Sequence, residues 1–256
     1  MVKIVFLDVD GVLNTESTPG QFTFDDTCIE QFKVIMEKTR AKIVISSTWR
    51  YSQDTVNILL DKLKQHAILD KDDDFIGHTP HLGMVTNIPS LPLKDSHLTR
   101  GDEILLWIKF NTILPGQSRQ DLIQNEKNYN PFKFEDGPEF FLQKSQEWST
   151  LNGWILPDPI ELDQFVIIDD MDLSKGCYAK TLQNHFVRTS AETGLVKENT
   201  KRAIKILNSD FNFKSWRKNS FTICPNPECL LKTEEEKNQT VQTINQNNNK
   251  NICCFQ

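Results

Sequence analysis

Ile4-Val5-Phe6-Leu7-Asp8-Val9-Asp10-Gly11 joins four apolar residues directly to two carboxylates. The unbroken β-prone run 4–7 predicts a strand buried on both faces, as strands of parallel sheets are. Asp8 and Asp10 stand where this strand ends, and two carboxylates this close repel each other while burial penalises both charges. Ligands of open α/β sheets bind at such strand ends. A bound cation or a phosphate-transfer site would account for the pair.

The same pattern of an apolar run with a polar end recurs twice more. The second run ends in Ser46 and Ser47, and the third ends in Asp169 and Asp170. Taken alone, a Ser-Ser-Thr turn after a strand is usually a helix cap. Three strand ends that carry carboxylates or hydroxyls instead predict one shared site at one edge of a sheet.

Helical periodicity separates these strands. Asp25 or Asp26 can cap a helix whose apolar face recurs through residues 28–36, and residues 56–63 repeat that spacing. Residues 99–102 have the form of a helix-opening box. Strands alternating with helices predict an α/β fold with a doubly wound, mostly parallel sheet.

The stretch Asp8-Val9-Asp10-Gly11-Val12-Leu13-Asn14 resembles motif I of the haloacid dehalogenase (HAD) superfamily of phosphatases. The resemblance implies that Asp8 is a nucleophile. It implies that Asp10 is a general acid/base that also offers its backbone carbonyl to Mg²⁺. Ser46 stands where HAD motif II places a hydroxyl that hydrogen-bonds the phosphoryl group, and Ser47 is the alternative one position on.

The acidic pair at the third strand end resembles HAD motif IV, whose acids complete the Mg²⁺ shell. Asp170 is the better ligand candidate, Asp169 comes next, and Asp172 is an outer option. The resemblance therefore assigns the metal to Asp8, Asp10, Asp169 and Asp170.

HAD motif III supplies a cation, more often Lys, that bridges the nucleophile and the phosphate. Arg100 resembles this cation by position, at the start of a predicted helix. Lys94 and Lys175 are the alternatives.

A narrower resemblance covers about residues 1–110 and 161–208. The order of the segments Ile-Ser-Ser-Thr-Trp-Arg, Phe-Ile-Gly-His-Thr-Pro, Arg-Gly-Asp-Glu-Ile and Ile-Ile-Asp-Asp is similar to that in HAD domains of Swiss-army-knife RNA-repair proteins. The stretch between the first two strands has room for a loop and one helix, so no large cap domain is expected. An open site favours large phosphorylated substrates.

The expected organisation has five parts, bounded by changes in composition. The core is interrupted by a polar insertion rich in aromatics, which we expect to fold onto it. The end of the chain is too polar to offset the entropy of ordering, which predicts a disordered tail. The parts are the first core segment 1–110, the insertion 111–160, the second core segment 161–210, an extension 211–232 and the tail 233–256.

Composition predicts a cytoplasmic protein. The 256 residues carry a net charge of −6, which disfavours nonspecific electrostatic binding of nucleic acid. No apolar run is long enough for a membrane span. The ending Cys253-Cys254-Phe255-Gln256 matches the C-a-a-X pattern, which predicts a farnesyl group on Cys253 and association with a cytoplasmic membrane face. An unmodified tail is the alternative, because a cysteine four residues from the end can arise by chance and Cys254 is a less usual residue at its position. One lipid chain alone gives only marginal membrane binding.

The sequence thus predicts a Mg²⁺-dependent phosphatase that forms an aspartyl-phosphate. Its substrate class stays open among an RNA or DNA end, a nucleotide and a phosphoprotein, and the oligomeric state is unknown. The alternative is a non-catalytic phosphate-binding or scaffolding HAD module. The presence of both Asp8 and Asp10 weighs against that alternative.

Overall fold

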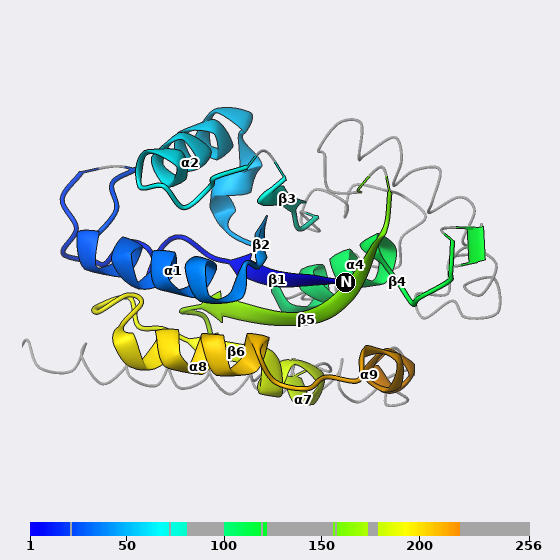
Figure 1. Ribbon diagram of the computed structural model, residues 1–256. Coiled ribbons are helices and arrows are strands. Elements are labelled where there is room, and N and C mark those ends of the chain that lie inside the picture. The colour runs from blue at the N-terminus through cyan, green and yellow to red at the C-terminus, as the bar shows by residue number, and fades with distance from the viewer. Residues whose placement is uncertain are drawn as a thin grey trace, which may run out of the picture. The chain divides into compact units, whose positions relative to one another are not determined.

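A parallel sheet with strand order β3-β2-β1-β5-β4 forms the centre of the molecule, and β6 pairs with the other end of β5 (Figure 1). The computed structural model describes residues 1–20, 22–71, 73–80, 100–118, 120–121, 156, 158–173 and 179–220, all within the unit Met1–Phe221. The strands are β1 (Val2–Leu7), β2 (Lys42–Ile45), β3 (Phe75–His78), β4 (Thr112–Ile113), β5 (Ile160–Asp169) and β6 (Phe186–Arg188).

The two central strands set the register of the functional edge. Leu7 of β1 lies opposite Ile45 of β2 on one side and Ile168 of β5 on the other. The three residues that follow these positions therefore lie at the same level along the sheet: Asp8 and Ser46 come just after their strands, and Asp169 is the last residue of β5. This register explains why three distant sequence segments meet at one edge.

Helices follow the strands on both faces of the sheet. The α-helices are α1 (Asp26–Thr39), α2 (Gln53–Gln65), α4 (Arg100–Asn111), α7 (Ala179–Leu182), α8 (Lys197–Leu207) and α9 (Phe213–Ser220). Short 3₁₀ helices are η1 (Thr48–Tyr51) and η2 (Gln183–His185). Asp25 caps α1 by accepting hydrogen bonds from the Thr27 and Cys28 amides at 2.9 and 3.1 Å, as a short acidic side chain at a helix start is expected to do.

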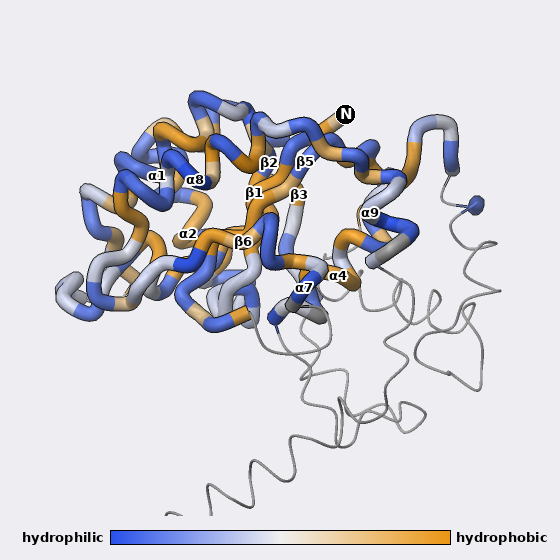
Figure 2. Tube along the Cα trace, turned by 90° about the horizontal axis from the view of Figure 1, so that it is seen from below, coloured by the Kyte–Doolittle hydropathy of each residue, from blue (hydrophilic) through white to orange (hydrophobic). Residues whose placement is uncertain are grey.

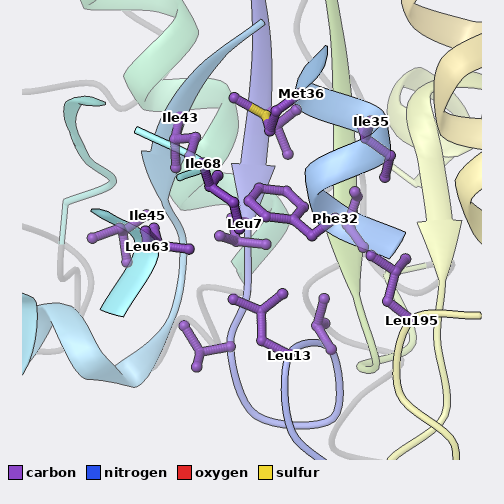
Figure 3. Packing of buried hydrophobic residues seen from close by; sticks show 14 of the residues in the cluster. Leu7, Leu13, Phe32, Ile35, Met36, Ile43, Ile45, Leu63, Ile68 and Leu195 are labelled. Carbon is purple, nitrogen blue, oxygen red and sulfur yellow. The ribbon is translucent and has the colours of Figure 1, made fainter. Parts of the chain in front are cut away.

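Two apolar clusters hold the helices to the sheet. Alternate residues of β1 point to opposite faces, so Leu7 packs with Phe32 and Leu59 of α1 and α2, whereas Phe6 packs with Trp107 of α4. The apolar tube of the strands runs between more polar helices in Figure 2. Figure 3 shows the first cluster, in which the Phe32 ring lies beside Leu7. Burial on both faces accounts for the unbroken apolar runs in the strand sequences.

The expected fold class is confirmed: a mostly parallel α/β sheet with helices on both faces, without a large cap between β1 and β2. The five-part division stays a prediction. Most of the insertion 111–160 and all of the tail 233–256, with Cys253, lie outside the described residues. Among the residues that the structure describes, no helix is both long and apolar enough to cross a membrane.

Candidate active site

The end of β1 places Asp8 at the centre of the site. Its amide donates to the Ile168 carbonyl at 3.0 Å, which ties it to β5, and its side chain is only 6% exposed. The chain then turns sharply through Gly11, whose φ of +70° favours a residue without a side chain. A Cβ at Gly11 would lie 2.5 Å from Asp170 Oδ2. Gly11 therefore lets the turn approach Asp170.

Three carboxylates meet at this edge. Asp8, Asp169 and Asp170 each offer an oxygen, and these oxygens lie within 4.8 Å of one another. Asp8 and Asp169 are buried, whereas Asp170 is half-buried. The Asp169 Oδ1 atom also accepts the Met171 amide at 2.9 Å, which fixes its orientation.

Arg100, the first residue of α4, enters the cluster from the other side. Its Nη1 atom lies 3.0 Å from Asp8 Oδ1 and 3.3 Å from Asp169 Oδ2. The same nitrogen donates to the Ser46 carbonyl. Arg100 thereby joins the ends of β1, β2 and β5. Lys94 and Lys175, the alternative cations, lie outside the described residues.

Burial dominates the electrostatics of the cluster. It raises the pKa of the Asp8 carboxyl above its ordinary value, against the opposing effects of Arg100 and a Ser47 hydrogen bond. Burial, and next the charge of Asp8, raise the pKa of Asp169 to about 7. Burial alone would disfavour the Arg100 charge, but Asp8 and Asp169 raise the pKa of Arg100. The carboxylates are therefore short of positive charge.

The two serines at the end of β2 have different roles. Ser46 is fully buried, and its Oγ has no hydrogen-bond partner among the described residues. Ser47 Oγ accepts the Trp49 amide at 3.4 Å, and the Ser47 side chain also hydrogen-bonds Asp8. An unpaired buried hydroxyl is costly. Of the two serines, Ser46 therefore has the hydroxyl that can hydrogen-bond a ligand oxygen.

Asp10 is not one of the three clustered carboxylates, and its side chain hydrogen-bonds other groups. Its oxygens accept the Trp49 indole N–H at 3.2 and 3.1 Å, and Oδ1 also accepts Asn14 Nδ2 at 2.9 Å. A cavity of about 280 Å³ borders Asp10, Gly11 and Asp170, with the loop between β1 and α1 as its wall. A larger cavity of about 770 Å³ borders Met1 and Lys3, at the opposite end of β1.

A buried ion pair supports the β2 loop from behind. Arg50 Nη2 lies 2.5 Å from Glu103 Oε2, and Arg50 Nη1 donates to the Ser47 carbonyl. Burial lowers the pKa of the Arg50 guanidinium, and Glu103 opposes that shift. The pair joins η1 to α4, the helix that carries Arg100. Neither Arg50 nor Trp49 was predicted as a site residue, although both lie in the segment that carried the narrower resemblance.

A comparison with known protein families fits this geometry. Residues 4–119 match the model of a family described as the HAD domain in Swiss Army Knife RNA repair proteins. Over these residues the chain resembles a HAD domain, and its mostly parallel α/β sheet is consistent with that fold. The match includes Asp8, Asp10 and Arg100, whereas Asp169 and Asp170 lie beyond it. No curated protein and no solved structure matches the chain.

The donor set of this HAD-like site fits a hard divalent cation. When ionised, the three carboxylates carry more negative charge than the Arg100 guanidinium can balance, and Arg100 is the cation paired with Asp8 and Asp169 in the described part of the chain. Carboxylate oxygens are the ligands that Mg²⁺ prefers. Burial, and after it the repulsion from neighbouring carboxylates, raises the pKa values of Asp8 and Asp169, and a divalent ion would offset both effects. Asp8, Asp169 and Asp170 would hold it.

The structure thus brings together most of the residues that the sequence singled out. Arg100 contacts both Asp8 and Asp169, and Ser47 hydrogen-bonds Asp8. Asp170 completes the carboxylate cluster. Ser46 joins through its backbone carbonyl. Asp10 lies beside the cluster, where its side chain bonds Trp49 rather than the other acids. Its predicted role as a metal ligand concerns the backbone carbonyl and stays a prediction.

Proposed function

We propose that this chain is a Mg²⁺-dependent phosphatase that acts through a phosphorylated Asp8 on a phosphorylated macromolecule or nucleotide. The observation that carries the proposal is the contact of Arg100 with Asp8, inside a cluster of carboxylates at the ends of β1 and β5. A nucleophile, an anion-binding cation and a divalent-metal donor set then lie within one site.

In the first step, an Asp8 oxygen attacks phosphorus in line, and the bond from phosphorus to the ester oxygen breaks. The protonated Asp10 carboxyl gives its proton to the departing oxygen, so the alcohol leaves neutral. In the second step, the Asp10 carboxylate takes a proton from water as that water attacks phosphorus. Inorganic phosphate and the Asp8 carboxylate are released.

Charge repulsion is the main obstacle to the first step. A carboxylate and one phosphate charge at about 4 Å repel by about 1 kcal/mol in water and about 4 kcal/mol at an effective dielectric of 20. Arg100 offsets part of this repulsion, and the Ser46 hydroxyl is available to donate to a phosphoryl oxygen. When bound, Mg²⁺ supplies the remaining positive charge and aligns the oxygens.

A panel of phosphorylated probes tests the proposal. The family's name favours a nucleic-acid end, so the panel compares RNA and DNA oligonucleotides with a 3′- or 5′-phosphate against mononucleotides and phosphopeptides. We expect Mg²⁺-dependent phosphate release from at least one class, abolished in Asp8→Asn. Release that persists in a folded Asp8→Asn protein would contradict the assigned nucleophile.

The alternative is a HAD-like module that binds phosphate without turnover. The unpaired Ser46 hydroxyl and Arg100 would serve binding as well as catalysis. The two functions differ in one measurement. A binding module retains the phosphorylated probe intact in the presence of Mg²⁺, whereas the phosphatase releases phosphate from it.

A further inference from the structure

The Trp49 indole is aimed at the carboxyl group of Asp10. Its Nε1 atom lies 3.2 Å from Asp10 Oδ1 and 3.1 Å from Oδ2, so one N–H is shared between both oxygens. Asn14 Nδ2 donates to Oδ1 at 2.9 Å, and the Gly11 amide donates to Asn14 Oδ1 at 3.0 Å. Asp10 is thereby held from the β2 side and from its own loop.

Trp49 is itself fixed in place. The residue is 6% exposed, and its ring meets Phe22 edge-on, with ring centroids 5.1 Å apart, and a tilted Phe24 at 6.0 Å. The Trp49 amide donates to Ser47 Oγ, and its carbonyl accepts from Thr55 Oγ1. A donor whose backbone and ring are both anchored holds its N–H in one direction without further loss of side-chain entropy.

We propose that Trp49 is a positioning residue that orients Asp10 for proton transfer to the leaving oxygen. This proposal rests on the proposed function. When the ester bond breaks, the proton passes from Asp10 to the departing oxygen, and negative charge appears on the Asp10 carboxylate. The indole N–H faces the oxygens on which this charge develops, where a preorganised donor stabilises the transition state.

A purely structural role for Trp49 predicts a different outcome. If its ring served only to pack η1 against the loop of Phe22 and Phe24, its loss would slow the enzyme equally with every leaving group. A residue that acts through Asp10 matters only when the leaving oxygen needs a proton. The dependence of the rate on the leaving group separates the two roles.

Phenyl phosphate and 4-nitrophenyl phosphate provide matched probes. The two aryl groups are similar in shape, but 4-nitrophenolate departs without a proton, whereas the more basic phenolate needs one. The value of kcat/KM reports the steps up to this departure. We expect Trp49→Phe to lower kcat/KM by about tenfold on phenyl phosphate and by less than about twofold on 4-nitrophenyl phosphate. The tenfold decrease corresponds to the loss of one hydrogen bond to a charged group.

Trp107→Phe is the matched control. Trp107 is also buried and meets Phe6 edge-on at 5.4 Å, but its Nε1 has no partner among the described residues. Its replacement removes a buried indole without removing a hydrogen bond, so the two probes should respond alike. Incorporating benzothienylalanine at position 49, which keeps the ring shape with sulfur in place of N–H, covers the case in which Trp49→Phe folds poorly.

A double-mutant cycle tests whether Trp49 acts through Asp10. On phenyl phosphate, adding Trp49→Phe to Asp10→Asn should cause no further loss. Equal losses on the two probes, or a full further loss in the Asp10→Asn background, would overturn the role of Trp49 and leave the phosphatase intact. A wild-type protein that shows no Asp8-dependent release from the two aryl phosphates or from any phosphorylated probe of the panel would overturn the proposed function together with this inference.

Discussion

Arg100 Nη1 lies 3.0 Å from Asp8 Oδ1, and both side chains are less than a tenth exposed. The same nitrogen lies 3.3 Å from Asp169 Oδ2, so one guanidinium serves two buried carboxylates. A buried charge that loses its partner is strongly destabilising. The stability of the metal-free site therefore depends on Arg100.

We expect Arg100→Gln to lower the free energy of unfolding in EDTA by about 3 kcal/mol, because Asp8 and Asp169 are left uncompensated. Saturating Mg²⁺ should restore part of the loss, since a divalent ion replaces the missing charge. Chemical denaturation with and without Mg²⁺ measures both values. The matched control is Lys42→Gln, which breaks the exposed pair of Lys42 with Asp73 and should change little. A loss as small as that of the control would contradict the structural role of Arg100.

Asp170 is expected to carry much of the Mg²⁺ affinity. In the wild-type protein, Mg²⁺ at about 100 times its Kd should raise the melting temperature by about 5–10 °C, because it binds only the native state. Asp170→Ala should remove most of this rise, since the carboxylate cluster then loses one of its three members. Differential scanning fluorimetry measures it. If Asp172→Ala, and not Asp170→Ala, abolished the rise, the ligand would be Asp172.

The central strands and their polar ends were predictable because a strand buried on both faces has an unbroken run of apolar residues, which stops where the strand ends. The runs before Asp8, Ser46 and Asp169 are β1, β2 and β5, and the parallel register brings those three ends together. Arg100 was predicted only by position, because nothing in a sequence fixes the direction of a long side chain. The structure places it on Asp8.

The contact of Trp49 with Asp10 could not be predicted from the sequence. A tryptophan after a strand reads as a core residue, and its ring is indeed buried. Only the 3₁₀ turn of η1, with Ser47 as its cap, directs the indole N–H back to Asp10. The Arg50–Glu103 pair was missed for a related reason, because isolated charged residues are usually exposed.

Gly11→Ala should disturb the metal site through Asp170. The left-handed backbone costs an alanine about 1 kcal/mol, and its Cβ would also lie 2.5 Å from Asp170 Oδ2. Gly116→Ala is a close control, because Gly116 has a φ of +78° with no described atom within 4 Å of its added Cβ. We expect Gly11→Ala, but not Gly116→Ala, to weaken the Mg²⁺-dependent rise in melting temperature. Equal effects of the two variants would show that backbone strain, and not contact with Asp170, dominates.

His185 gives the core a defined response to acid. Its ring stacks on Phe165 with centroids 4.0 Å apart, and Nδ1 lies 3.2 Å from the Phe165 carbonyl, which accepts the Nδ1 proton. Burial lowers the pKa of His185 to about 4 from an ordinary value of 6.5. The native state therefore keeps the ring neutral at pH values at which the unfolded chain is already protonated.

The sign of the pH effect follows from this difference. Between pH 6.5 and about 4 the unfolded state binds one more proton than the native state, so stability falls as the pH falls and is fully present above 6.5. The whole effect is on the order of 3 kcal/mol. In His185→Phe, which keeps a stacked ring, the difference in unfolding free energy between about pH 7.5 and about pH 4.5 should shrink by about 2 kcal/mol. Contributions of the carboxyl groups are common to both proteins and cancel in this comparison. Urea denaturation at the two pH values measures it, with His66→Gln at the end of α2 as the control for loss of a histidine outside the core. If the pH dependence of the unfolding free energy were the same in His185→Phe as in the wild type, His185 would bind its proton equally well in the native and unfolded states, and burial would not lower its pKa.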